Sequence, residues 1–286
     1  MKVILEKKLY GYCPGLIRSF SVADDLIAKA KRTKKKIFCD VPLAHNTDVM
    51  KNLRRQGVEL IKVEDEKVND GSYFLISAHG ASDIKIAHLR KLGYEVVDAT
   101  CPKVAAVQNQ AIVDFQNGYQ IVIFGKADHA EIRGINGLID DSAIMVSDLE
   151  SAAKIKLTQK TSIISQTTLP LDKFQSLIEI LKTNNSGIEI LERKTTCPIV
   201  RNRIMQTVEL AKGQKVKMAV VVGSTTSSNT KSLARTLEAV CPTLMVSGEN
   251  ELKEGDFKNI KSVLVVSGTS APPEIVEKVA AKLRSF

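Results

Sequence analysis

The sequence predicts an α/β fold made of three small units, each built on a mostly parallel sheet. Two observations predict this class. Short apolar runs alternate with longer helical stretches along all 286 residues. The strand candidates are also continuous Val/Ile runs rather than alternating ones, a pattern typical of parallel strands that helices cover on both faces.

Residues 1–99 contain the first set of alternating elements. Apolar runs predict strands, and apolar residues at helical spacing between them predict helices. A run of three lysines at residues 34–36 follows the first helix, where cations favour the helix dipole. The expected strands are 3–5, 36–41, 73–77 and 94–98, and the expected helices are 16–30, 48–56 and 83–91.

The same alternation continues through residues 100–195 and 196–286. Pro102 and Pro198 suit the first turn of a helix, so each is expected to open one. In the second segment, the expected strands are 119–124, 143–146, 161–165 and 188–191, with helices at 103–116 and 171–183. In the third segment, the expected strands are 218–222, 243–246 and 262–266, with helices at 198–212, 230–239 and 273–284.

The cysteines indicate how these elements divide. Eleven strands are too many for one comfortable open sheet at this length, and no Gly/Ser/Pro-rich linker marks a boundary. Cys13, Cys101 and Cys197 each precede a proline and are separated by 88 and 96 residues. This near-even spacing predicts units at 1–99, 100–195 and 196–286. Cys241 also precedes a proline but follows a helix, so we expect it, like Cys39, to be a buried apolar residue.

Composition excludes several classes of protein. A 44% hydrophobic share excludes disorder, and no apolar run approaches the ~18 residues of a membrane span. The N-terminus lacks the apolar core of a signal peptide, so the five cysteines indicate reduced thiols in a cytoplasmic protein. The net charge is +9, but without Trp and with 5% aromatics a nucleic-acid surface is disfavoured. A small anionic substrate or an acidic electron-transfer protein fits this charge.

The three evenly spaced cysteines form a candidate metal site. Ligands of parallel sheets bind beyond the carboxyl ends of strands, where these residues are expected. Zinc sites usually take two ligands from one Cys-x-x-Cys or similar unit, and none occurs here. Single, widely spaced cysteines suit an iron–sulfur cluster between units; with three thiolates, a [4Fe–4S] cluster keeps one iron unligated by protein. Three unrelated thiols at helix starts remain the alternative.

Polar residues at other strand ends form a candidate anion site. His45, His79 and His129 lie in turns after strands, whereas His88 lies within a helix. Residues 223–229 place hydroxyls at a helix start, as in a phosphate cradle, although helix capping could also use them. A P-loop is excluded because its second glycine is missing before Lys231. The candidate anion ligands are His45, His79, His129, Thr167, Ser227, Ser228, Asn229 and Ser270.

Two acidic residues flank His129 and could supply a proton. Asp128 is also well placed to cap the turn that follows it. Glu131 lies two residues beyond the histidine and is the better candidate. The sequence alone leaves both open.

These motifs, taken in order, resemble the LytB family of 4-hydroxy-3-methylbut-2-enyl diphosphate reductases. Nine matching motifs cover nearly the whole chain and are highly specific as a set. They are Gly-Tyr-Cys-Pro-Gly at 11–15, His-Asn at 45–46, Ser-Ala-His-Gly at 77–80, Asp-Ala-Thr-Cys-Pro at 98–102, His-Ala-Glu at 129–131, Gln-Thr-Thr at 166–168, Cys197 with Asn202 and Arg203, Ser-Ser-Asn at 227–229, and Gly-Thr-Ser-Ala-Pro at 268–272.

The resemblance implies three α/β domains in a pseudo-threefold array around a [4Fe–4S] cluster held by Cys13, Cys101 and Cys197. It implies that His45, His79, His129, Ser227, Ser228, Asn229 and Ser270 bind the diphosphate. Thr167 would position the allylic hydroxyl, and Glu131 would donate protons. The implied reaction yields isopentenyl and dimethylallyl diphosphates, with electrons from a ferredoxin or flavodoxin, whose acidity suits a basic partner.

The chain departs from the family pattern at two motifs. Residues 198–201 read Pro-Ile-Val-Arg where an Ala-Thr-Thr stretch is common, and Ala130 replaces a proline. Neither departure removes a proposed ligand or proton donor. They leave open a related iron–sulfur enzyme acting on another allylic or dehydratable substrate. A non-catalytic iron–sulfur sensor or a zinc protein is the alternative of a different class.

Overall fold

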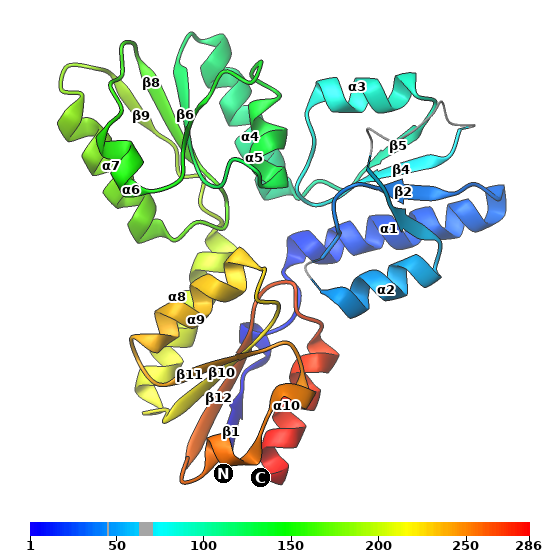
Figure 1. Cartoon of the computed structure of the whole chain (residues 1–286), viewed down its shortest axis with the longest axis vertical. Helices are drawn as coiled ribbons and strands as arrows, with labels where there is room; N and C mark the ends of the chain where they lie inside the picture. The colour runs from blue at the N-terminus through cyan, green and yellow to red at the C-terminus, as the bar shows by residue number, and fades with distance from the viewer. Residues whose placement is uncertain (45, 63–70) are drawn as a thin grey trace. The chain divides into compact units, whose positions relative to one another are not determined.

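The computed structural model describes residues 1–44, 46–62 and 71–286, and its strands form three four-stranded sheets (Figure 1). Every strand pair is parallel. The α/β class and the three parallel sheets predicted from the sequence are therefore confirmed.

One sheet combines both ends of the chain. Its strand order is β1-β12-β10-β11, and helices α8, α9 and α10 pack against it. In Figure 1 the blue β1 lies beside the orange β12. The strands are β1 (Lys2–Leu5), β10 (Met218–Val222), β11 (Thr243–Val246) and β12 (Ser262–Ser267); the helices are α8 (Pro198–Gly213), α9 (Ser228–Glu238) and α10 (Pro273–Ser285).

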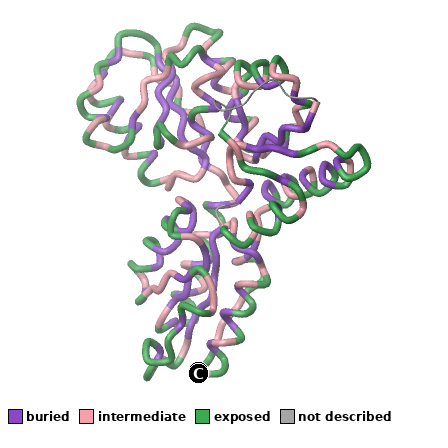
Figure 2. The backbone as a smooth tube through the Cα atoms, turned by 45° about the vertical axis from the view of Figure 1, so that its right-hand side comes forward, coloured by how far each residue is buried: buried purple, intermediate pink, exposed green. Residues whose placement is uncertain are grey.

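The valine runs of this sheet are explained by burial on both faces. Val220 and Val222 pack with α10, whereas Val221, between them, packs with α8 and α9. Successive side chains of a strand point to opposite faces, so a strand covered on both sides needs apolar residues at every position. Figure 2 shows such strands in the buried colour.

A second sheet has the order β3-β2-β4-β5. Its core includes Phe38, Phe74 and Tyr94, whose rings meet edge to face. The strands are β2 (Ile37–Cys39), β3 (Val58–Leu60), β4 (Tyr73–Ile76) and β5 (Glu95–Asp98); the helices are α1 (Pro14–Thr33), α2 (Thr47–Arg55) and α3 (Asp83–Lys91).

The third sheet has the order β7-β6-β8-β9 and is also covered on both faces. Val122 packs with α7, and Ile123 with α4 and α5. The strands are β6 (Gln120–Phe124), β7 (Ile144–Val146), β8 (Thr161–Ser165) and β9 (Ile190–Glu192); the helices are α4 (Pro102–Gln116), α5 (Ala130–Asn136), α6 (Leu149–Ala153) and α7 (Leu171–Asn184).

The described chain groups into two compact units. Unit 1 contains Met1–Leu16, Ala44–Met50 and Pro198–Phe286, and unit 2 contains Ile17–Leu43 and Lys51–Cys197. Residues 1–99 were expected to form one domain, but β1 pairs with β12 in the sheet of unit 1. The boundaries at residues 99 and 195 stay predictions.

Among the α-helices and strands of the described residues, three short ones were not predicted from the sequence. Strand β3 has one buried residue out of three, and α5 and α6 span seven and five residues. Such lengths are too short to show a clear period of apolar residues. Several boundaries also differ by two or three residues. The strand expected at 36–41 is the shorter β2 (Ile37–Cys39), and β9 begins at Ile190 rather than residue 188. Helix α1 spans Pro14–Thr33 rather than 16–30, and α9 begins at Ser228 rather than residue 230.

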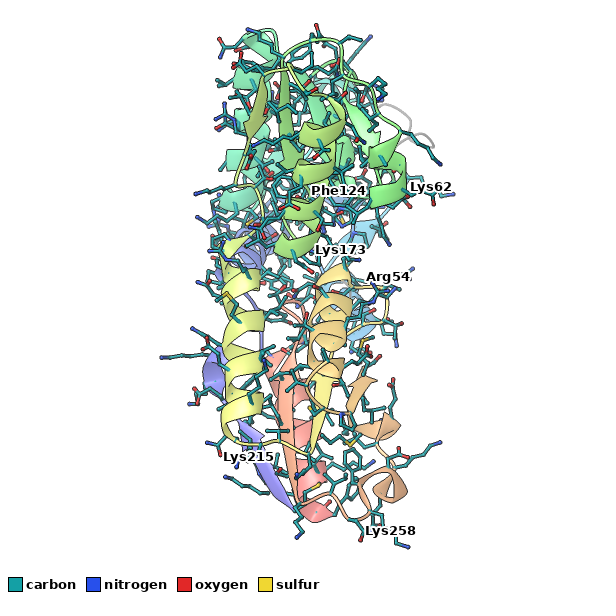
Figure 3. All side chains as sticks on the ribbon, turned by 90° about the vertical axis from the view of Figure 1, so that its left-hand side faces the viewer. Arg54, Lys62, Phe124, Lys173, Lys215 and Lys258 are labelled. Atoms are coloured by element: carbon teal, nitrogen blue, oxygen red, sulfur yellow. The ribbon has the colours of Figure 1, made fainter. Side chains whose placement is uncertain are left out.

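Side-chain exposure agrees with the basic composition. Figure 3 labels Lys173, Lys215 and Lys258, all exposed, and Phe124, which is buried in the third sheet.

None of the helices in the described parts of the chain is both long and apolar enough to cross a membrane.

Candidate functional site

In unit 2, the predicted site residues follow the carboxyl ends of strands. His79 follows β4, Cys101 follows β5, and Thr167 follows β8. His129 and Glu131 follow β6, at the start of α5. Loops at this end of parallel strands are where α/β folds bind ligands.

The two predicted ligand cysteines of unit 2 are each tied by their backbone to a neighbouring loop of the site. The Cys101 amide donates to the carbonyl of Ala78 (3.0 Å), and the Cys197 amide donates to that of Thr167 (2.7 Å). Cys101 is the N-cap of α4, and its thiol makes no capping hydrogen bond. The two thiols are partly exposed and are placed by the same loops that carry the polar site residues.

The rings of His79 and His129 lie against each other. Their centroids are 5.4 Å apart, with an interplanar angle of 72°. His79 Nδ1 is 3.0 Å from Ser77 Oγ, and the Glu131 amide donates to His129 Nδ1 at 3.3 Å. Because an amide can only donate, a neutral His129 carries its proton on Nε2, which suits a phosphate oxygen.

Glu131 is a buried acid that is hydrogen-bonded to Thr167. Its side chain is 2% exposed. The Thr167 amide donates to Oε1 (2.6 Å), and the Thr167 hydroxyl donates to Oε2 (2.9 Å). Burial raises the pKa of Glu131 to about 7, although both hydrogen bonds oppose this rise. A carboxyl group with such a pKa can hold and release a proton near neutral pH.

Asp128, the alternative acid, is exposed. It does not cap α5, as the sequence had suggested it could, because the N-cap is His129. The structure thus separates the two acids: one is a surface residue, and the other is buried against Thr167.

In unit 1, Cys13 is held in a turn before α1. Its amide donates to the carbonyl of Thr269 (3.2 Å). The Gly11 amide donates to Ser267 Oγ (2.9 Å), and Arg203 Nη1 donates to the Gly11 carbonyl (2.7 Å). Gly11 has a φ of 78°, which favours glycine. In the sequence, Arg203 stands out only as part of a motif, because residue spacing does not reveal this contact with Gly11.

The start of α9 carries the polar segment of unit 1. Ser227 is its N-cap and accepts from the Thr230 amide, so the capping alternative holds for this residue. Asn229 Nδ2 donates to Thr269 Oγ1 (2.8 Å). Ser228 and Ser270 are partly exposed. These residues lie after β10 and β12, which are adjacent in the sheet.

The structure divides the predicted site residues into two sets. Unit 2 holds Cys101, Cys197, His79, His129, Glu131 and Thr167, and unit 1 holds Cys13, Ser227, Ser228, Asn229 and Ser270. His45 lies outside the described residues. Among the described residues, no three or more His, Cys, Asp or Glu side chains are grouped to hold one metal ion. A three-cysteine site stays a prediction.

Cys39 and Cys241 are distinct from the three site cysteines. Both are buried, as the sequence predicts. Burial, with a contribution from Asp40, raises the pKa of Cys39 to about 12, and burial also raises that of Cys241. Metals bind the thiolate form, so these two cysteines are unsuited to be ligands. The donor chemistry leaves Cys13, Cys101 and Cys197, which fits a three-thiolate cluster.

Comparisons with known proteins agree on one family. A model of the LytB protein family matches residues 3–284. A 4-hydroxy-3-methylbut-2-enyl diphosphate reductase of Thermoanaerobacter sp. (strain X514) is 32% identical over 99% of this chain and 97% of its own length. The enzyme of the same name from Burkholderia pseudomallei (strain 1026b) is 30% identical, covering 100% of this chain and 90% of its own.

Two solved structures share the fold. One is the E-1-hydroxy-2-methyl-but-2-enyl-4-diphosphate reductase of Plasmodium falciparum, with a TM-score of 0.88 and 25% identity over 98% of this chain and 87% of that one. The other is an (E)-4-hydroxy-3-methyl-but-2-enyl diphosphate reductase described as the terminal enzyme of the non-mevalonate pathway. Its TM-score is 0.71, with 26% identity and full coverage of both chains.

Proposed function

The chain belongs to the LytB family, and from this premise we propose that it is a 4-hydroxy-3-methylbut-2-enyl diphosphate reductase. The substrate gains two electrons and two protons and loses its allylic hydroxyl as water. The products are isopentenyl and dimethylallyl diphosphates, which differ in which allylic carbon receives a proton.

Cys13, Cys101 and Cys197 are the proposed ligands of a [4Fe–4S] cluster. The exposure of the thiols supports this assignment. These three cysteines are partly exposed and lie at helix starts, whereas the other two cysteines are buried. When bound, such a cluster supplies electrons and, at the iron without a protein ligand, a Lewis acid.

The Glu131–Thr167 pair is the observation that carries the proposal. Loss of a hydroxyl as water needs a proton, and a carboxyl with a pKa of about 7 can supply it. Thr167 Oγ1 lies 2.9 Å from Oε2. When Glu131 is protonated on Oε2, this hydrogen bond reverses: the carboxyl donates to Thr167 Oγ1, and the hydroxyl can pass its own proton to the substrate as it takes the one from Glu131. Burial keeps bulk water from this acid, which protects a reductive step from proton leakage.

The diphosphate is proposed to bind His45, His79, His129, Ser227, Ser228, Asn229 and Ser270. His129 supports this role because its hydrogen bond at Nδ1 leaves the proton of a neutral ring on Nε2. The first turn of α9 adds hydroxyls and backbone amides near the positive end of the helix dipole. The electron donor is proposed to be an acidic ferredoxin or flavodoxin, which suits the net charge of +9.

The test is turnover by protein purified without oxygen. We expect the reduced protein to convert the hydroxylated diphosphate into the two products. A Cys101→Ser variant is expected to lose acid-labile sulfide and activity, with Cys241→Ser as its matched control. An intact cluster without turnover would contradict the proposal and favour another substrate or a sensor role. Zinc without sulfide would contradict the cluster.

A further inference from the structure

Gln108 is a buried polar residue that the proposed chemistry does not use. It lies on α4, about two turns after Cys101. The side chain is 8% exposed, and its Nε2 has no hydrogen-bond acceptor among the described residues. A buried donor without an acceptor is unfavourable, so hydrogen bonding does not explain the position of this side chain.

The amide of Gln108 contacts two glycines that belong to the histidine-bearing segments. Gly80 follows His79 directly, and Gly134 lies in α5, whose N-cap is His129. A Cβ on Gly80 would lie 2.5 Å from Gln108 Nε2, and a Cβ on Gly134 would lie 3.4 Å from the same atom. The Gln108 amide therefore occupies the space that a side chain at Gly80 would need, and it packs at ordinary contact distance beside Gly134.

Helix α4, the turn that carries His79 and helix α5 come close together around Gln108. The Cβ position of Gly134 is also 3.5 Å from the amide nitrogen of Ala81, which follows Gly80. Gly80, Ala81 and Gly134 line a cavity of about 400 Å³. Atoms that line a cavity lack packing partners on that side, so their spacing depends more on the contacts that remain.

We propose that Gln108 is a positioning residue that sets the separation between the His79 turn and α5. It does so by filling the space between Gly80 and Gly134, and thereby keeps the rings of His79 and His129 together. The ligand served by this spacing is an organic diphosphate, so this inference rests on the proposed function.

Three variants separate positioning from general stability. Gln108→Ala empties the space, Gln108→Met fills it without a polar group, and Gln116→Ala changes an exposed glutamine of the same helix. In the anaerobically purified holoenzyme, we expect Gln108→Ala to raise KM for the diphosphate on the order of tenfold, with kcat little changed. Gln108→Met should restore KM and melt no lower than the wild type, because it removes the unpartnered donor. Gln116→Ala should match the wild type.

A second measurement needs no substrate. Amide hydrogen exchange at residues 77–81 and 129–134 should be faster in Gln108→Ala and normal in Gln108→Met. If the wild type turns over no diphosphate, the proposed function fails, and exchange still decides whether Gln108 positions these segments. Unchanged exchange in Gln108→Ala would overturn the inference. A lower melting temperature with unchanged KM, or a Met variant that folds but behaves like Ala, would overturn it as well.

Discussion

At the scale of single residues, the environment of Glu131 determines its chemistry. Glutamate is normally ionised at pH 7, but burial raises the pKa of this one to about 7. The neighbouring Asp128 is exposed. Two acids three positions apart therefore differ in burial, and only Glu131 contacts Thr167.

The first prediction concerns activity. Glu131→Gln should lower kcat by about 100- to 10,000-fold, the usual contribution of a general acid, with cluster content unchanged. Because the protonated form is active, wild-type kcat should fall as the pH rises above about 7. Steady-state rates from pH 6 to 9 measure this. Asp128→Asn is the matched control, and equal losses in both variants would contradict the assignment.

The second prediction concerns stability. The folded protein holds a proton on Glu131 up to pH of about 7, whereas the unfolded chain releases it near 4.5. The part of the unfolding free energy that comes from this proton is therefore complete below pH 4.5. It falls by about 3 kcal/mol as the pH rises to about 7. Glu131→Gln should lack this part of the pH dependence. Urea unfolding at several pH values gives the unfolding free energy of the wild type and of Glu131→Gln as a function of pH. The same pH dependence in both proteins would contradict the raised pKa.

Single-residue roles could be predicted from sequence only where a motif carried them. Glu131 was favoured because it follows His129 at a fixed spacing. The contacts of Gln108 with Gly80 and of Arg203 with Gly11 join residues far apart in the sequence. Such contacts depend on how helices pack against turns, which local spacing does not encode.

At the scale of elements, a partly buried ion pair holds the segment that leads to Cys197. Asp114 of α4 is 1% exposed and accepts hydrogen bonds from Ser162 on β8 and from Arg193, which follows β9. Burial alone would raise the pKa of Asp114, but the hydrogen bonds from Arg193 and Ser162 hold it below its usual value. Asp114 thus joins α4 to β8 through Ser162, and to the segment after β9 through Arg193.

The third prediction follows from this pair. Arg193→Met should lower the free energy of unfolding by about 1–3 kcal/mol, because the buried Asp114 carboxylate loses its charged partner but keeps the hydrogen bonds from Ser162 and Gln110. The control is Lys154→Met, which breaks the exposed pair with Glu150 and should cost about 0.5 kcal/mol or less. Urea unfolding at pH 7 measures both changes. Similar small losses would show that the Arg193–Asp114 pair is not stabilising.

Prediction of elements from sequence was limited by length and by pairing. Long helices such as α4 and the continuous strands β6 and β10 were predicted because their patterns repeat over enough residues. The seven-residue α5 has too few turns to show a period. Sequence alone also could not show that β1 pairs with β12, because pairing partners depend on the whole chain.

At the scale of the whole molecule, the most separated parts of the chain form one sheet. Lys2 lies opposite Ser262 in the β1–β12 pair, and Val3 and Leu5 pack on the core formed with α10. Two hydrogen bonds hold the segment after β1. The Gly11 amide donates to Ser267 Oγ, and Arg203 donates to the Gly11 carbonyl. Figure 1 shows both chain ends at this sheet.

The last prediction is that the β1–β12 pair forms late in folding. Pairing distant segments requires closing a long loop. The chain loses the conformational entropy of that loop before the stabilising contacts form. The β6–β8 pair, with Gln120 opposite Thr161, closes a much shorter loop. Pulsed hydrogen exchange during refolding should therefore show protection in β6 and β8 before β1 and β12. Simultaneous protection of both pairs would mean that loop closure does not order the folding of these sheets.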